Sequence, residues 1–220
     1  MDQKAPEPME STRSQNMAKR RSNILYHARN VIAHEGFEAL KVRDLADRAG
    51  LTVPTIYNLI GSKSDLLKCI IEELVEQLLE AQARIVIDDA EHIFEAQIDE
   101  LVKLFATDED YYRAAFIAGD RSGLFEQEST SGIFARSVQY PENACKLAKD
   151  KRLLRGNLCP EQLGRQIYGC YRLARQDWTN GYFNLPTFRK QALTGVFLSL
   201  AADASPAFRE RLVLRIQSLA

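Results

Sequence analysis

The stretch LKVRDLADRAGLTVPTIYNLIGSK, residues 40–63, decides the fold of the N-terminal part of this chain of 220 residues. Its apolar residues recur at helical spacing up to Gly50, where a helix can end in the left-handed conformation that glycine adopts without steric penalty. Thr52 is suited to cap the next helix, and Pro54 falls in its first turn, where the missing N–H has little effect. With Ile56 returning to the core, the pattern predicts a helix-turn-helix.

The outer side of the second predicted helix is polar, which a purely structural helical corner would not need. Hydroxyl and ammonium groups suit phosphate oxygens, which fix the register on DNA, whereas base edges are read from the start of the helix. Arg43 is placed to reach a guanine edge, and the alternative for it is a surface salt bridge to Asp44 or Asp47. The predicted DNA-binding residues are Arg43, Thr52, Val53, Pro54, Thr55, Tyr57, Asn58 and Lys63.

Residues 20–70 resemble the TetR family of transcriptional regulators. The resemblance is carried by the segments 24–35, Gly36-Phe37-Glu38-Ala39, Val42-Arg43-Asp44-Leu45-Ala46, Ala49-Gly50-Leu51-Thr52, Pro54-Thr55-Ile56-Tyr57 and Gly61-Ser62-Lys63 through Leu66-Leu67. Lys41 departs from the usual Thr or Ser, and Leu59 and Ile60 replace the common aromatic or His and Phe. The resemblance implies an all-α fold, with a three-helix DNA-binding domain followed by a helical ligand-binding and dimerisation domain.

Charge and composition divide the chain in the same way. Residues 17–70 hold nine Lys and Arg against five Asp and Glu, whereas residues 71–220 hold eighteen against twenty-two. A basic module on an acidic remainder suits a protein that touches nucleic acid at one end. We expect a disordered arm over residues 1–18, a DNA-binding domain over 19–65 and a helical domain over 66–220. The run Lys19-Arg20-Arg21 is either a solvated helix start or, as in the family, an arm near the minor groove or phosphates.

The remainder of the chain reads as a long helix from Lys63 to about residue 86 and six further helices. Glycines 119 and 123 are expected to kink or split the helix over residues 108–126, and Pro141 to bend or break the helix over residues 131–154. An aromatic set in these two helices is either simple core or, as the resemblance implies, the lining of an effector cavity. The candidate ligand-binding residues are Tyr112, Phe116, Phe125, Phe134 and Tyr140.

The resemblance also places a four-helix dimer interface on the helices over residues 160–182 and 186–203. Small residues there, Gly164, Gly169 and Gly195, would let helices approach closely. The candidate interface residues are Leu163, Ile167, Cys170, Ala174, Trp178, Leu193, Val196 and Leu200.

Catalytic and metal-binding patterns are missing from the sequence. There is no P-loop, HExxH or GxSxG, the chain has three His, and its four Cys include no CxxC pair. We therefore expect no catalytic residues, metal or cofactor. The first twenty residues are polar, and the longest uncharged apolar stretch falls short of the roughly 20 residues that a bilayer span needs, so we expect a cytoplasmic protein without a membrane partner.

These observations predict a DNA-binding transcriptional regulator, most simply a repressor. It would bind a near-palindromic double-stranded operator as a homodimer and be released by a small, largely apolar effector. The alternative is a helical ligand-binding or scaffold protein whose helix-turn-helix no longer reads DNA.

Overall fold

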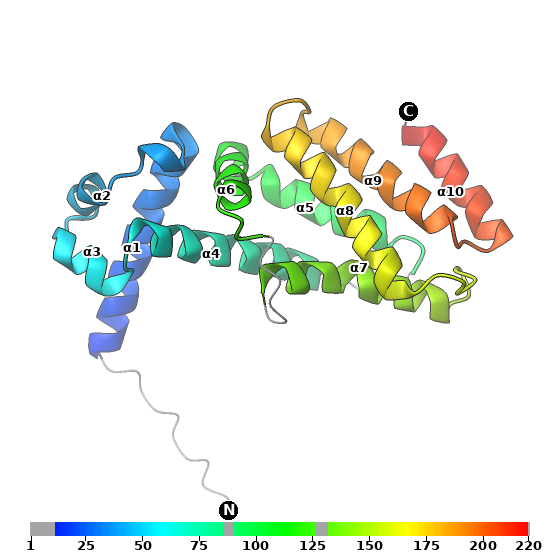
Figure 1. The fold of residues 1–220 in the computed structure, drawn as a ribbon, viewed down its shortest axis with the longest axis horizontal. Coiled ribbons are helices and arrows are strands. Elements are labelled where there is room, and N and C mark those ends of the chain that lie inside the picture. Colours follow the sequence, from blue (N-terminus) through cyan, green and yellow to red (C-terminus); the bar gives the residue numbers. More distant parts are fainter. Residues whose placement is uncertain (1–11, 86–89, 126–131, 220) are drawn as a thin grey trace, which may run out of the picture. The chain divides into compact units, whose positions relative to one another are not determined.

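The computed structural model describes residues 12–85, 90–125 and 132–219, and in these ranges the chain is helical apart from its connections (Figure 1). The described residues form ten α-helices, one 3-10 turn and an isolated bridge between Leu154 and Ala204. Among these helices, none combines the length and apolar content of a membrane span. The chain divides into two compact units, residues 1–70 and 71–220. The division lies inside a helix, five residues beyond the domain boundary predicted at residue 65.

The first unit contains α1 (Thr12–Glu35), the 3-10 turn η1 (Phe37–Ala39), α2 (Val42–Ala49), α3 (Val53–Leu59) and the start of α4 (Lys63–Ala83). The predicted helix-turn-helix is confirmed in its details. Gly50 ends α2 with φ of 66°, and the Thr52 hydroxyl accepts a hydrogen bond from the Thr55 N–H at 3.4 Å. The core of this unit is apolar and almost fully buried: Ile24, Ala28, Ile32, Leu40, Leu45, Ala46, Ile56, Leu66, Leu67 and Ile70.

Helix α1 begins at Thr12, which corrects the prediction of a disordered arm over residues 12–18. The composition of this segment is polar, but it contains no Pro or Gly and several good helix formers. Extending an existing helix adds one hydrogen bond for each residue fixed, so no separate nucleus is needed. Residues 1–11 lie outside the described part of the chain.

The second unit contains the rest of α4 and six further helices: α5 (Ile93–Phe105), α6 (Glu109–Arg121), α7 (Ile133–Asp150), α8 (Pro160–Thr179), α9 (Leu185–Ala201) and α10 (Pro206–Leu219). Its core is rich in aromatic rings. Trp178 is fully buried and stacks on Phe105, with ring centroids 4.9 Å apart, and both rings pack against Phe188.

At Gly119 and Pro141, two of the predicted interruption points, the helices continue without a break. Helix α6 runs through Gly119 and ends at Arg121, and Gly123 follows with φ of 68°. Helix α7 runs through Pro141 to Asp150. A proline inside a helix is unfavourable by about 3 kcal/mol, but residues on both sides of it, such as Val138 and Cys145, are buried in the unit. Their packing holds the helix in one piece.

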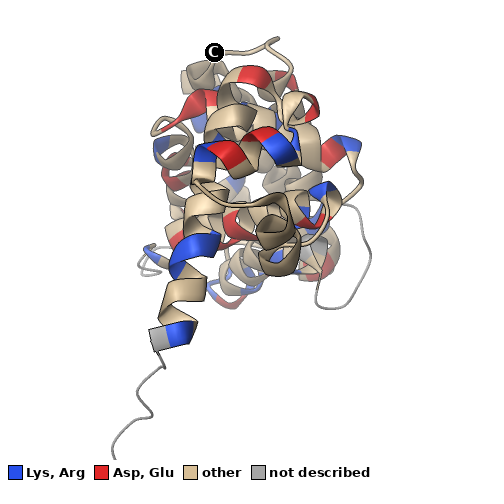
Figure 2. Cartoon of the chain, turned by 90° about the vertical axis from the view of Figure 1, so that its left-hand side faces the viewer, with Lys and Arg blue, Asp and Glu red and all other residues tan. Residues whose placement is uncertain are grey.

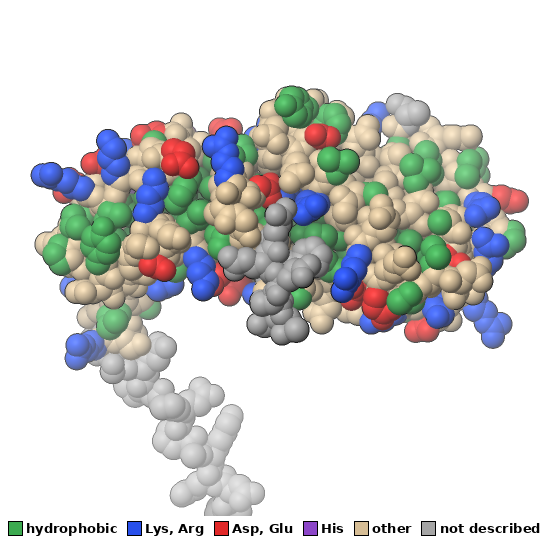
Figure 3. Space-filling view, in the orientation of Figure 1, with side chains coloured by type: hydrophobic (Ala, Val, Ile, Leu, Met, Phe, Trp, Pro, Cys, Tyr) green, Lys and Arg blue, Asp and Glu red, His purple; other side chains and the backbone are tan. Residues whose placement is uncertain are grey.

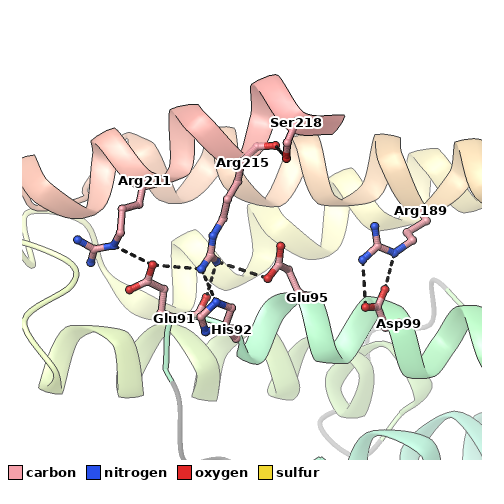
Figure 4. Close-up of polar contacts among 8 residues, drawn as sticks. All are labelled: Glu91, His92, Glu95, Asp99, Arg189, Arg211, Arg215 and Ser218. Atoms are coloured by element: carbon pink, nitrogen blue, oxygen red, sulfur yellow. Dashed lines mark hydrogen bonds and ion pairs between the residues drawn. The ribbon is translucent and has the colours of Figure 1, made fainter. Parts of the chain in front are cut away.

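Charged residues tie α10 and α9 to α5 and the turn before it (Figure 4). Arg215 lies 3.1 Å from Glu91 and 3.5 Å from Glu95, and the Glu91 carboxylate also accepts from Arg211 at 2.8 Å. Arg189 donates two hydrogen bonds to Asp99. These groups are partly exposed, so each pair adds modestly to stability, and together they fix α10 against the unit.

Candidate nucleic-acid interface and cavity

Helix α3 buries one side and presents the other to solvent. Ile56 is 1% exposed, whereas Tyr57 is 53% exposed and Asn58 is also exposed. Pro54 and Thr52 are exposed at the start of the helix, and Val53 and Thr55 are half-buried. The structure therefore brings the predicted residues of this helix to one end and one outer side of α3. That these residues contact DNA stays a prediction.

Two side chains of α1 bind the C-terminal ends of α2 and α3, the two helices of the helix-turn-helix. Arg21 donates from Nη1 to the carbonyl oxygen of Leu59 at 3.2 Å, and Asn23 donates from Nδ2 to the carbonyl oxygen of Ala49 at 3.0 Å. The last carbonyls of a helix lack partners inside the helix, so these bonds satisfy groups that would otherwise need water. Sequence reasoning missed both residues. For Arg21, the basic run of residues 19–21 does not show which cation turns towards a helix end.

The exit from α3 is fixed by a reciprocal cap at the start of α4. The Ser62 hydroxyl accepts from the Asp65 N–H at 3.2 Å, and the Asp65 carboxylate accepts from the Ser62 N–H at 2.8 Å. Hydrogen bonds from the Ser62 hydroxyl and N–H lower the pKa of Asp65. Gly61 precedes the cap with φ of 110°, and a Cβ there would lie 2.5 Å from the Asp65 carboxylate. The Ser62–Asp65 cap therefore requires the glycine before it.

The two predicted cations differ in their surroundings. Arg43 is exposed, and within the described residues it forms no ion pair with Asp44 or Asp47, so the salt-bridge alternative is wrong in this structure. Lys63 is half-buried; its Nζ donates to the carbonyl oxygen of Glu38 at 3.1 Å and lies 4.7 Å from the ring centroid of Phe37. An ammonium has three donors, so this anchored group keeps donors for a phosphate.

The N-terminal turns of α1 lie beside α3 and add positive charge to that side (Figure 2). A surface groove is shared between the two helices. It is bordered on the α1 side by Arg13, Asn16, Met17 and Arg20, and on the α3 side by Thr55, Asn58 and Leu59.

The second unit contains a cavity of about 90 Å³ among α4 to α9. Phe116, Phe125 and Tyr140 line it, as predicted for ligand-binding residues. Tyr112 does not, which corrects that prediction. Its side chain is packed in the core, where the hydroxyl donates to Gln77 at 2.9 Å and the ring lies against Phe105. The side chain of Phe134 lies outside the described part of the structure.

A charged side chain in the cavity wall was not predicted. Arg175 is 2% exposed, donates from Nη2 to Asp120 Oδ1 at 2.7 Å and lies 4.4 Å from the ring centroid of Phe116. A signal was present in the sequence. Arg175 falls at helical spacing with the aromatic residues Tyr168, Tyr171 and Trp178, so a cation stands on a largely buried stripe.

The predicted dimer residues form the core of the second unit rather than its surface. Seven of the eight are buried within the chain, and Cys170 is half-buried. Two of the small residues serve contacts inside the chain as well. A Cβ at Gly164 would lie 2.7 Å from the Glu142 backbone, and one at Gly195 would lie 2.6 Å from Cys170 Cβ. A helix pair has two faces, and the prediction selected the face that packs inward.

The outer face of α8 and α9 has a different composition. Leu173 is 61% exposed and Leu198 is 59% exposed, and a Cβ added at Gly169 would meet nothing within 4 Å. In Figure 3 most side chains over these helices are uncharged. Uncharged residues that are exposed or half-exposed at helical spacing along the two helices include Gln162, Gln166, Gly169, Leu173, Gln176, Gln191, Thr194, Leu198 and Ala202. We call this set the outer α8–α9 face.

Residues 24–70, which span the helix-turn-helix and its α1 support, match the model of the bacterial regulatory proteins of the tetR family. These residues form a DNA-binding domain of the TetR family type. With this N-terminal helix-turn-helix domain and the helical domain that follows it, the chain has the all-helical fold of TetR-family regulators. No curated protein sequence matches this chain.

Solved structures of TetR-family regulators share the fold of this chain. A TetR transcription regulator from Haloarcula marismortui is 16% identical with a TM-score of 0.70, covering 86% of this chain and 100% of its own. SmeT, the repressor of the Stenotrophomonas maltophilia multidrug efflux pump SmeDEF, is 18% identical with a TM-score of 0.67, covering 86% and 92%. A gamma-butyrolactone receptor is 12% identical with a TM-score of 0.62, covering 93% and 97%.

Proposed function

We propose that this regulator is a homodimeric repressor that is released from its operator by a small, largely apolar molecule. The observation that supports the proposal most directly is that α3 has an exposed outer side and is held at its C-terminal end. Its outer side is free of contacts with the core, while α1 holds its C-terminal end and the Ser62–Asp65 cap holds its exit. A helix offered in this way can enter the major groove without rearranging its own supports.

In this proposal, the contacts that read the base sequence come from α3 and from Arg43 at the start of α2. Arg43 reaches a guanine edge, Val53 and Pro54 contact a thymine methyl, and Asn58 contacts a base edge. Thr55, Tyr57 and Lys63 bind phosphate oxygens and set the register. Arg13 and Arg20 border the groove beside α3, and they extend this phosphate contact along α1.

The outer α8–α9 face is the dimer surface in this proposal. One helix-turn-helix makes few base contacts, and a near-palindromic operator matches a two-fold dimer. The face carries two exposed leucines amid uncharged side chains, and the open space above Gly169 admits the side chain of a second copy.

The effector occupies the cavity of the second unit. Val75, Leu78 and Leu79 of α4 line this cavity, and α4 is the helix that continues from the first unit. A ligand that shifts α4 changes the DNA-binding unit through a continuous helix, with a coupling of about 1–3 kcal/mol. Two neighbours in fold are SmeT in a complex with triclosan and a gamma-butyrolactone receptor, which supports an effector site in this proposal.

A reporter gene behind the DNA upstream of the chain's own gene tests repression. We expect the wild-type protein to lower expression and the Asn58→Ala and Tyr57→Ala variants to restore it. A rise in expression with wild type would identify an activator. No change, with no gel shift of the same DNA, would favour the alternative of a ligand-binding or scaffold protein.

A further inference from the structure

The cavity of the second unit has an unpaired hydrogen-bond donor in its wall. Arg175 Nε is buried, and among the described residues no acceptor lies within hydrogen-bond distance of it. The rest of the side chain is fixed by the ion pair with Asp120 and by the ring of Phe116. Buried donors are nearly always paired, so this one indicates an acceptor that a bound molecule supplies.

The chain is built to hold this guanidinium in place. The ring centroid of Phe125 lies 4.9 Å from the guanidinium carbon. That ring fits because Gly119 has no side chain, since a Cβ there would lie 2.2 Å from Phe125 Cε2. Gly119 has no positive φ, so glycine is needed here to leave room for the Phe125 ring and not to allow a special backbone conformation. Cation–π contacts of this kind suit a cation that has lost its water.

Neutral donors surround the same part of the cavity. Burial raises the pKa of Tyr171 and of Tyr168, so both phenols stay protonated at neutral pH. No described residue hydrogen-bonds the Tyr171 hydroxyl, and both tyrosines line the cavity beside Arg175. Most of the other lining residues are aliphatic or aromatic, and the further polar members are Gln82, Gln97 and Ser137.

The charge of the Arg175–Asp120 pair discriminates between a carboxylate and a neutral oxygen as the acceptor. Arg175 is the one charged residue among the described lining residues, and Asp120 already neutralises it. A carboxylate ligand would bring a second negative charge to a neutral pair and lose its hydration. A neutral oxygen loses much less hydration and accepts the same N–H.

We propose that the cavity binds a compact, mostly apolar molecule with one neutral oxygen acceptor, such as a ketone, ester or lactone carbonyl, and that Arg175 Nε–H donates to that oxygen. This inference rests on the proposed function, because it names the chemical class of the effector. It also extends that function, because it assigns recognition of the polar group to a specific donor.

Three probes of nearly equal shape test it: isopropylbenzene, acetophenone and benzoate. The cavity of about 90 Å³ is smaller than the roughly 150 Å³ that holds benzene, so these compact probes bind only as the cavity widens around them. Dissociation constants are measured by ligand-observed NMR on the full-length protein. Wild type is compared with Arg175→Lys, which keeps a cation opposite Asp120 but removes the Nε–H. Arg165→Lys, at an exposed position on the same helix, is the matched control.

We expect Arg175→Lys to weaken acetophenone binding by about tenfold or more while isopropylbenzene changes less than twofold. Arg165→Lys leaves both unchanged, and wild type binds acetophenone more tightly than benzoate. If circular dichroism shows that Arg175→Lys does not fold, the double variant Arg175→Met with Asp120→Asn replaces it, with the same expected result.

Each contrary result has a separate meaning. Equal losses of acetophenone and isopropylbenzene would overturn the role of the Nε–H. Tighter binding of benzoate than of acetophenone in wild type would overturn the neutral acceptor and indicate an acidic effector. Binding of none of the probes by wild type would overturn this inference together with the effector cavity, whereas repression of the reporter would still stand.

Discussion

Arg21 of α1 donates a hydrogen bond across 3.2 Å to the carbonyl oxygen of Leu59, the last residue of α3. The next cation in sequence, Arg20, instead borders the groove beside α3. Arg21 thus stabilises the C-terminal end of α3, whereas Arg20 faces the side where DNA would lie. The two residues therefore form a matched pair for experiment.

Removing Arg21 should destabilise the first unit. We expect Arg21→Met to lower the free energy of unfolding by about 1 kcal/mol, because a hydrogen bond from a charged donor to an orphan carbonyl is lost. Arg20→Met should leave stability unchanged and reduce the salt dependence of DNA binding by about one unit of slope for each lost phosphate contact. Urea unfolding measures the free energy of unfolding, and fluorescence anisotropy at several salt concentrations measures DNA binding. The division of roles would be wrong if the two variants behaved alike.

The two predicted DNA-binding cations should differ in the same experiment. Arg43→Ala should cost about 1–3 kcal/mol on operator DNA and little on random DNA, because a bidentate contact to guanine discriminates between bases. Lys63→Met should weaken binding to both DNAs alike, because a phosphate contact carries no sequence information. Equal losses on both DNAs for Arg43→Ala would remove it from the base-reading residues.

The outer α8–α9 face can be tested by adding charge. We expect Leu173→Glu together with Leu198→Glu to give folded monomers that no longer bind a palindromic operator, because a charge in the centre of an interface is desolvated without a partner. Val213→Glu, at an exposed position of α10, is the control and should leave the dimer intact. Light scattering gives the mass, and a dimer that survives both substitutions would place the interface elsewhere.

Acid should weaken a contact at the start of α6. Partial burial opposes ionisation of Glu109, but hydrogen bonds from Trp178 and Arg113 outweigh it and lower the pKa below the ordinary value. The ionised group therefore stabilises the fold above the unfolded pKa of about 4.3, and this contribution is lost as the pH falls through the lowered folded pKa. Urea unfolding of wild type and Glu109→Gln should differ at neutral pH and converge in acid. A difference that is constant with pH would exclude this carboxylate as the cause.

Local sequence signals predicted the first unit well. Gly50, Thr52 and Pro54 act within a few residues of themselves, through a left-handed turn, a cap and a first-turn proline, so their effect can be read from the sequence. The start of α1 was misplaced because polar composition suggested disorder where helix propensity was adequate.

Contacts between distant residues could not be predicted in this way. The stripe that includes Trp178 and Val196 was correctly recognised as apolar, but periodicity alone does not say whether a stripe faces the core or a second copy. Gly119 looked like a helix break, yet its effect depends on where the ring of Phe125 lies. The cavity wall was found in part from aromatic residues, whereas Arg175 required knowledge of its partner Asp120.

The central claim is that α3 and Arg43 read a DNA sequence, and fluorescence anisotropy tests it most directly. The titration compares labelled DNA from upstream of the chain's own gene with a scrambled duplex of equal length and composition, at physiological salt. We predict that wild type binds the upstream DNA about 10³-fold or more tightly than the scrambled duplex, and that Asn58→Ala lowers this ratio without abolishing binding to either. Equal affinity for the two duplexes, with operator candidates tiled across the whole upstream region, would contradict the account.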